Sequence, residues 1–162
     1  MPDQVDRIQA QWARERPDLD VAPQGVIGRL HRLANHLTAQ LCLVYERFGL
    51  SEGEFDVLAT LRRAGAPYEL APGGLAEHTM VTTGAMTKRL DRLERDGLVS
   101  RRLSAEDGRG RVVALTAAGR RVIDDAFADH MANEHRLLAM LDPADAAHLE
   151  TILRTWLARI EP

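Results

Sequence analysis

Apolar residues recur at helical spacing in the first third of the chain. Between Gln24 and Phe48 they fall close to a seven-residue repeat over three heptads, which predicts one long helix with a seam for another helix. The positions are Val26, Ile27, Leu30, Leu33, Leu37, Leu41, Val44, Tyr45 and Phe48. A helix over residues 3–15 is predicted to precede it and to end before Pro17, because the residue before a proline avoids the helical region.

Residues 51–97 are predicted to form three shorter helices. Ser51 and Glu54 have the spacing of a capping box, which opens a helix that stops near residues 65–67. A helix over residues 72–78 follows, and then one that Thr82 caps and that ends at residues 96–97.

The hydrophobic period then changes, and two strands are predicted. Residues 98–103 and 111–115 are joined by a polar turn that contains glycine, which is typical of a β-hairpin. Thr116 caps a helix over residues 117–140, and Asp142 with Pro143 opens the last one. The apolar positions of the last helix are Leu149, Ile152, Leu153, Trp156, Leu157 and Ile160.

This order predicts a mainly α fold with a small β-hairpin wing, a winged helix-turn-helix with long terminal helices for dimerisation. We expect N-terminal helices over residues 1–48, a DNA-binding lobe over residues 49–116 and C-terminal dimerisation helices over residues 117–162.

Composition narrows the class of protein. The chain has 162 residues, of which 45% are hydrophobic and 28% charged, and no apolar run approaches the length of a membrane span. The first residues do not read as a secretion signal, so we expect a cytoplasmic protein.

Few residues suit a metal or catalytic site, and the sequence predicts no cofactor. Cys42 is the only cysteine and lies among apolar residues, which favours packing over a reactive thiolate. His130 and His135 are five residues apart, which is not the i, i+4 spacing of a zinc pair, so His130 is expected to be structural. No nucleophile and base pairing, phosphate loop or HExxH-type motif is found, so we expect no enzyme.

Charge is unevenly distributed. The net charge is −3, but residues 81–121 hold ten Lys/Arg and five Asp/Glu, a net +5 that leaves −8 for the remainder. A solvated surface would be the ordinary interpretation. Because the basic segment coincides with the helix and hairpin of the motif, it is instead typical of a nucleic-acid-binding face.

Candidate DNA contacts follow from this placement. On the helix over residues 83–95, the side chains opposite the apolar face can reach base edges, and Lys88 can donate to guanine. Arg92 and Arg95 flank this face and suit phosphates, while Arg109 and Arg111 at the hairpin suit a narrow minor groove. The full predicted set is Thr82, Thr83, Gly84, Thr87, Lys88, Arg92, Arg95, Arg109 and Arg111.

These residues resemble the MarR family (multiple antibiotic resistance regulators) from Leu75 to Gly119. The segments that match are Leu75-Ala76-Glu77, residues 83–94, Gly97-Leu98-Val99, Asp107-Gly108-Arg109-Gly110-Arg111 and Leu115-Thr116-Ala117-Ala118-Gly119. With the long flanking helices, the resemblance covers essentially the whole chain. It implies an obligate homodimer whose terminal helices interlock and whose wings straddle a pseudo-palindromic operator. Ala71 and Thr79 depart from the family pattern around the helix over residues 72–78.

The resemblance also implies a site for a small effector. The N-terminal segment with Trp12 is similar to a branch that responds to urate and related anions, and by position Trp12, Asp56 and Arg89 would surround the ligand, with Arg101 as a relay. Ala64 stands where that branch has an asparagine. The alternative is that Trp12 packs in the dimer and that Asp56 and Arg89 form a structural ion pair.

Together these features predict a ligand-responsive regulator of transcription, a repressor that binds double-stranded DNA as a homodimer. The alternative is a winged-helix module that binds a protein partner without reading DNA sequence. Lys88, Arg109 and Arg111 favour DNA.

Overall fold

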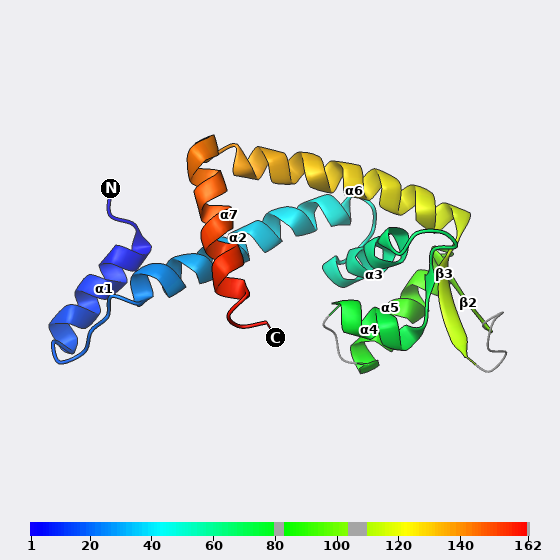
Figure 1. Cartoon of the computed structure of the whole chain (residues 1–162), viewed down its shortest axis with the longest axis horizontal. Coiled ribbons are helices and arrows are strands. Elements are labelled where there is room, and N and C mark those ends of the chain that lie inside the picture. The colour runs from blue at the N-terminus through cyan, green and yellow to red at the C-terminus, as the bar shows by residue number, and fades with distance from the viewer. Residues whose placement is uncertain (80–82, 104–109, 162) are drawn as a thin grey trace. The chain divides into compact units, whose positions relative to one another are not determined.

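The computed structural model describes residues 1–79, 83–103 and 110–161, and helices dominate them. The elements, all but β1 labelled in Figure 1, are α1 (Gln4–Glu15), α2 (Gln24–Glu46), α3 (Glu52–Arg63), β1 (Glu69–Leu70), α4 (Pro72–Thr79), α5 (Thr83–Arg95), β2 (Val99–Leu103), β3 (Arg111–Leu115), α6 (Ala117–Leu138) and α7 (Pro143–Leu157). They form two compact units, residues 1–40 and 41–162. Among the described residues, no helix has the length and apolar character needed to cross a membrane.

The first unit holds α1 against the start of α2. Asp3 caps α1 by accepting hydrogen bonds from the backbone of Val5 and Asp6, and Asp6 completes a capping box. Arg29 of α2 bonds to both aspartates, with nitrogen–oxygen distances of 2.8 Å to Asp3 and 2.6 Å to Asp6. Val5 is buried and packs on Gly28, where a Cβ atom would lie 3.3 Å from the valine. The predicted helix before Pro17 is confirmed.

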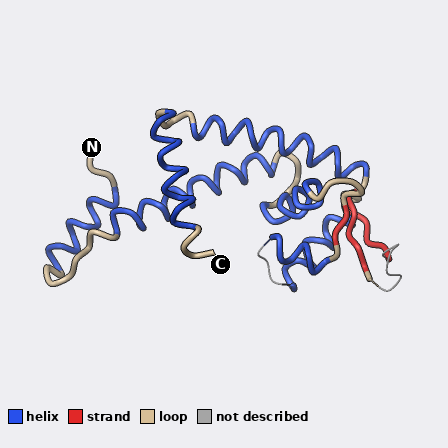
Figure 2. Tube along the Cα trace, in the orientation of Figure 1, coloured by secondary structure: helices blue, strands red, loops and turns tan. Residues whose placement is uncertain are grey.

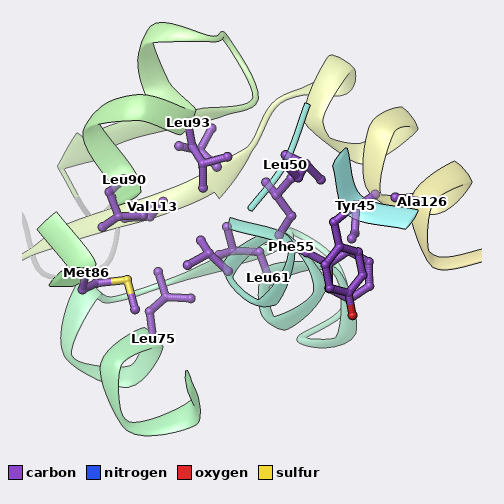
Figure 3. Close-up of a cluster of buried hydrophobic side chains, with 14 of the residues drawn as sticks. Tyr45, Leu50, Phe55, Leu61, Leu75, Met86, Leu90, Leu93, Val113 and Ala126 are labelled. Atoms are coloured by element: carbon purple, nitrogen blue, oxygen red, sulfur yellow. The ribbon is translucent and has the colours of Figure 1, made fainter. Parts of the chain in front are cut away.

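The second unit has one hydrophobic core, drawn in Figure 3. Its largest fully buried side chains come from α3, α4, α5, the sheet and α6, and include Leu58, Leu61, Leu75, Leu93, Val99, Val113 and Ile123. The end of α2 joins this core through Val44 and Tyr45. Full burial of such a side chain stabilises the fold by about 1.5–3 kcal/mol.

Three antiparallel strands form the sheet, in the order β1-β3-β2. Strands are red in Figure 2. The hairpin of β2 and β3 was predicted, and the structure pairs Val99 with Leu115 and Leu103 with Arg111. The two-residue strand β1 was not predicted. It exists because Glu69 and Leu70 find partners on β3, a long-range contact that no local pattern reports.

Two glycines shape the links from α5 into β2 and from β3 into α6. Gly97 has φ +71° and ends α5, a left-handed conformation that glycine adopts without strain. At Gly119 a Cβ atom would lie 1.9 Å from the carbonyl oxygen of Leu98, so only glycine allows the first turn of α6 to approach this closely. Thr116 caps α6 and donates its hydroxyl hydrogen to the Gly97 carbonyl at 2.7 Å.

Helix boundaries agree closely with the sequence, with small differences. Ser51 and Glu54 form the predicted capping box, and Asp142 caps α7 with Pro143 in its first turn. α2 ends at Glu46 rather than at Phe48, because residues 47–49 form a turn that leads into α3. α6 ends at Leu138, two residues earlier than expected.

α7 has no buried residue. Many apolar side chains of the α6 end, α7 and the residues that follow α7 are exposed instead: Leu138, Met140, Leu141, Leu149, Ile152, Trp156, Leu157 and Ile160. Thr151 and Thr155 donate their hydroxyl hydrogens to backbone carbonyls of the same helix, so they do not need water as a partner.

Candidate nucleic-acid interface

α5 has one buried face and one exposed face. Met86, Leu90 and Leu93 are at most 3% exposed and pack in the core, as the pattern predicted. Thr87 and Lys88 are exposed on the other side. Asp91, Arg92 and Arg95 are exposed as well. A rigid, half-buried helix with a polar outer face is what a major-groove reader requires.

The predicted contacts near the start of α5 are only partly described. Thr83 and Gly84 occupy its first two positions. Thr82, predicted as cap and contact, lies outside the described residues. These three assignments stay predictions.

The wing carries basic residues on both strands. Arg111 is exposed at the first position of β3, opposite Leu103. Arg102 on β2 is paired with Glu69 of β1. Arg109, like the rest of the turn over residues 104–109, lies outside the described residues, so its minor-groove role stays a prediction.

Arg101 of β2 forms ion pairs with α5, the helix predicted to read the major groove. Its guanidinium pairs with Asp91, its Nε atom lies 3.5 Å from Glu94, and its backbone N–H donates to Glu94 at 3.1 Å. The side chain is 24% exposed. Arg101 therefore ties α5 to the sheet, an engagement that the resemblance did not predict.

Arg89 and Arg92 of α5 both contact the first turn of α3. The Arg92 Nε atom lies 3.2 Å from the carboxylate of Glu54, whose side chain is 4% exposed. The Arg89 guanidinium lies directly over Gly53, where a Cβ atom would be 2.1 Å from the arginine Cζ. The Arg89 Nη1 atom is buried and has no hydrogen-bond partner among the described atoms.

Asp56 stands on α3 within electrostatic reach of Arg89. Loss of solvent around the carboxyl raises the pKa of Asp56 above its usual range, and Glu52 raises it further. Arg89, Arg63 and His130 oppose this by favouring the charged form. The structure thus places Asp56 and Arg89 in one electrostatic neighbourhood. Trp12 lies on α1, in the other unit, and is 47% exposed.

His130 belongs to an aromatic cluster. Its Nδ1 atom lies 3.1 Å from the hydroxyl of Tyr45, and its ring packs near those of Phe55 and Phe127. Tyr45 and Phe55 stack with ring centroids 4.1 Å apart. These contacts support the structural role expected of His130.

The surroundings of Cys42 disfavour its thiolate form. Burial raises the pKa of its thiol, and Glu52 and Glu46 raise it further. A raised pKa lowers the thiolate fraction near neutral pH, in agreement with packing.

Sequence reasoning missed the partners of the arginines. Glu54 was assigned as a cap only, and Gly53 was not singled out. A glycine directly before an acidic cap residue is the one local signal available, and it does not reveal which arginine lies above it. The arrangement as a whole is that of a winged-helix DNA-binding lobe.

The comparisons with known proteins define the family. A profile of the MarR family matches residues 48–110. The transcriptional regulator PecS of Dickeya dadantii is 39% identical over 150 residues, which is 93% of this chain and 90% of PecS. The transcriptional repressor Rv2887 of Mycobacterium tuberculosis is 34% identical over 122 residues, 75% of this chain and 84% of the repressor. The chain belongs to the MarR family of winged-helix transcriptional regulators.

A solved structure extends this likeness to the fold. A mutant of MarR from E. coli in complex with operator DNA has a TM-score of 0.72 and 26% identity, over 89% of this chain and 100% of that chain. This chain is a DNA-binding regulator of transcription, as its family defines.

Proposed function

We propose that the protein is a ligand-responsive repressor that acts as a homodimer on a pseudo-palindromic operator. The observation that carries this proposal is the exposed face of α5, with Thr87 and Lys88 outward and three core residues inward. The basic wing supports a second contact with DNA, since Arg111 is exposed at the start of β3. We place this activity in the cytoplasm, where the operator DNA lies.

The candidate DNA contacts of α5 and the wing are proposed to reach three different parts of the DNA. Thr83, Gly84, Thr87 and Lys88 face the major groove, Arg95 lies near phosphates, and Arg109 and Arg111 reach the minor groove. Arg92 is not included as a phosphate contact, because Glu54 and the carbonyl oxygen of Gly49 already hold it. Base contacts would give sequence preference, while Arg95 at phosphates would supply affinity that depends on salt.

Dimerisation is supported by the apolar surface of α6 and α7. Side chains such as Ile152, Trp156 and Leu157 are 36–47% exposed within one chain. An apolar helix face of this kind is stable when another helix covers it, and a symmetric dimer lets the same face serve on both copies.

An effector site is proposed around Asp56 and Arg89. The buried Arg89 Nη1 atom has no hydrogen-bond partner among the described residues, so it is available to donate to a planar anion, and the raised pKa of Asp56 supplies a carboxyl able to keep a proton. Trp12 would add an aromatic surface, as the family resemblance implies. Arg101 is not included as a direct contact, because Asp91 and Glu94 already hold it.

One experiment tests the DNA-binding proposal. The protein is used to select sequences from a random DNA library, and the selected site is titrated at several salt concentrations. We expect two half-sites whose centres lie about 10–10.5 base pairs apart, or a multiple of this, and an affinity that falls linearly with the logarithm of salt. Failure to select any sequence, together with capture of a protein partner by the same surface, would favour the interaction module instead.

A further inference from the structure

The first turn of α3 contains a buried carboxylate. The Glu54 Oε2 atom accepts hydrogen bonds from the backbone N–H and the hydroxyl of Ser51, both at 2.8 Å. The other oxygen faces Arg92 at 3.2 Å. Because a buried charge is costly unless partners satisfy it, these three contacts are what allow an acidic residue here.

Arg92 reaches this turn from α5. Its Nη2 atom also donates to the carbonyl oxygen of Gly49 at 3.5 Å, in the turn that joins α2 to α3. A carboxylate oxygen of Asp96, the residue directly after α5, lies 3.8 Å from the Arg92 Nε atom. Arg92 thereby connects α5 to the turn between α2 and α3.

Arg89 makes a second contact one turn earlier on α5. Its guanidinium occupies the space over Gly53 that any larger residue would fill. Two arginines of α5 therefore dock on consecutive residues of α3. Since successive residues of a helix are separated by about 100°, fixing Arg89 and Arg92 also fixes the direction in which Lys88 points.

We propose that Glu54 is a positioning residue for operator recognition. By holding Arg92, it fixes the orientation of the reading face of α5 and keeps the arginine from binding phosphates of any sequence. Glu54 contacts no DNA and acts through Arg92. The proposal rests on the proposed role of α5 as the reading helix.

The expected signature is a loss of sequence discrimination rather than of all DNA binding. With Glu54 neutral, α5 is held less firmly and operator affinity falls. The freed Arg92 can then pair with a phosphate, so affinity for unrelated DNA stays the same or rises, and its salt slope grows by about one unit. We expect the ratio of operator to unrelated-DNA affinity to fall about tenfold.

The main variant is Glu54→Gln, which keeps the size of the side chain and an oxygen for Ser51 but removes the charge. Full-length dimeric protein is titrated on the selected operator and on a scrambled fragment of equal length. Asp124→Asn is the matched control, because it breaks the 2.6 Å ion pair of Arg62 between α3 and α6, and the described partners of Asp124 are Arg62 and Arg120, not residues of α5. Its affinity ratio should stay unchanged.

The dependence on Arg92 is tested by a double-mutant cycle. In an Arg92→Gln background, Glu54→Gln should have no further effect on the affinity ratio. A folded Glu54→Gln variant with an unchanged ratio overturns the proposal, as does the same fall in both backgrounds. If Glu54→Gln does not melt cooperatively, Glu54→Asp, which withdraws the carboxylate from Arg92, is judged by the same criteria. Failure of the unmodified protein to select DNA would instead overturn the reading role of α5.

Discussion

At the scale of single residues, Lys88 is the side chain best placed to read a base. It is exposed on α5, and its ammonium group is among the donors that recognise guanine in the major groove. The neighbouring acid Asp91 is occupied by Arg101, so it does not neutralise the surface fully. This leaves a positive reading surface on a helix whose inner face is fixed by the core.

Lys88→Ala should therefore weaken operator binding by about 1–3 kcal/mol and relax the preference at one position per half-site. Fluorescence anisotropy with a set of single-base operator variants measures both effects. Arg14→Ala is the control, since Arg14 is exposed on α1 and lies outside the basic segment over residues 81–121. If Lys88→Ala and Arg109→Ala both leave the titrations unchanged, the reading face is assigned wrongly.

Asp56 is expected to make stability depend on pH. Because loss of solvent raises the pKa of Asp56, the folded protein holds this proton to a higher pH than the unfolded chain does. Its stabilising contribution is complete below the unfolded pKa and is lost as pH rises through the folded pKa. Asp56→Asn should therefore raise the melting temperature more at about pH 7 than at about pH 4.5, by an amount worth less than about 1 kcal/mol at this exposed position.

Asp125→Asn provides the comparison, because Asp125 is an exposed aspartate on α6. The pH-dependent difference should be absent in that variant. Equal melting temperatures for Asp56→Asn and the unmodified protein at both pH values would show that Asp56 titrates alike in the folded and unfolded chain.

At the scale of elements, local signals identified several helix caps but not that of Asp3 at the start of α1. Ser51, Thr116 and Asp142 were identified from the sequence, and all three stand at helix starts. β1 escaped because two residues carry no periodicity and their partners on β3 are distant in the chain. The contact of Glu54 with Arg92 escaped for the same reason, since a capping box satisfies local rules completely and leaves no sign of a second partner.

The exposed face of α7 leads to a prediction about dimerisation. Ile152→Ala should weaken the dimer by about 1–2 kcal/mol, as truncation of a central interface residue does. The measurement is the melting temperature over a range of protein concentrations, because unfolding of a dimer depends on concentration. Glu150→Ala, on the opposite side of α7, should change neither the dimer affinity nor this dependence. A cooperatively folded monomer at micromolar concentration in the unmodified protein would contradict dimerisation.

At the scale of the whole molecule, positive and negative charge lie in different parts of the chain. Residues 81–121 carry a net +5, whereas the rest of the chain carries −8. This division predicts that DNA meets the lobe in one orientation, since phosphates are attracted to one segment and repelled by the remainder. The charge distribution could be derived from the sequence, because the charges of individual residues can be summed along the chain. The placement of Trp12 relative to Asp56 could not, because it depends on how separate units assemble.

The last prediction concerns the coupling between effector and operator. If a planar anion binds at Asp56 and Arg89 and prefers the conformation free of DNA, linkage requires each ligand to weaken the other by the same factor, with a coupling of about 1–3 kcal/mol. Urate, xanthine, salicylate and small tricarboxylates are titrated by operator release and by quenching of Trp12, in a Trp156→Phe background so that one tryptophan reports. Arg89→Ala should abolish the ligand response more than it reduces DNA binding, because Arg89 lies behind the reading face over Gly53. Persistence of an active ligand's effect in both Trp12→Phe and Arg89→Ala would mean that Trp12 packs in the dimer and that Asp56 and Arg89 serve the fold alone.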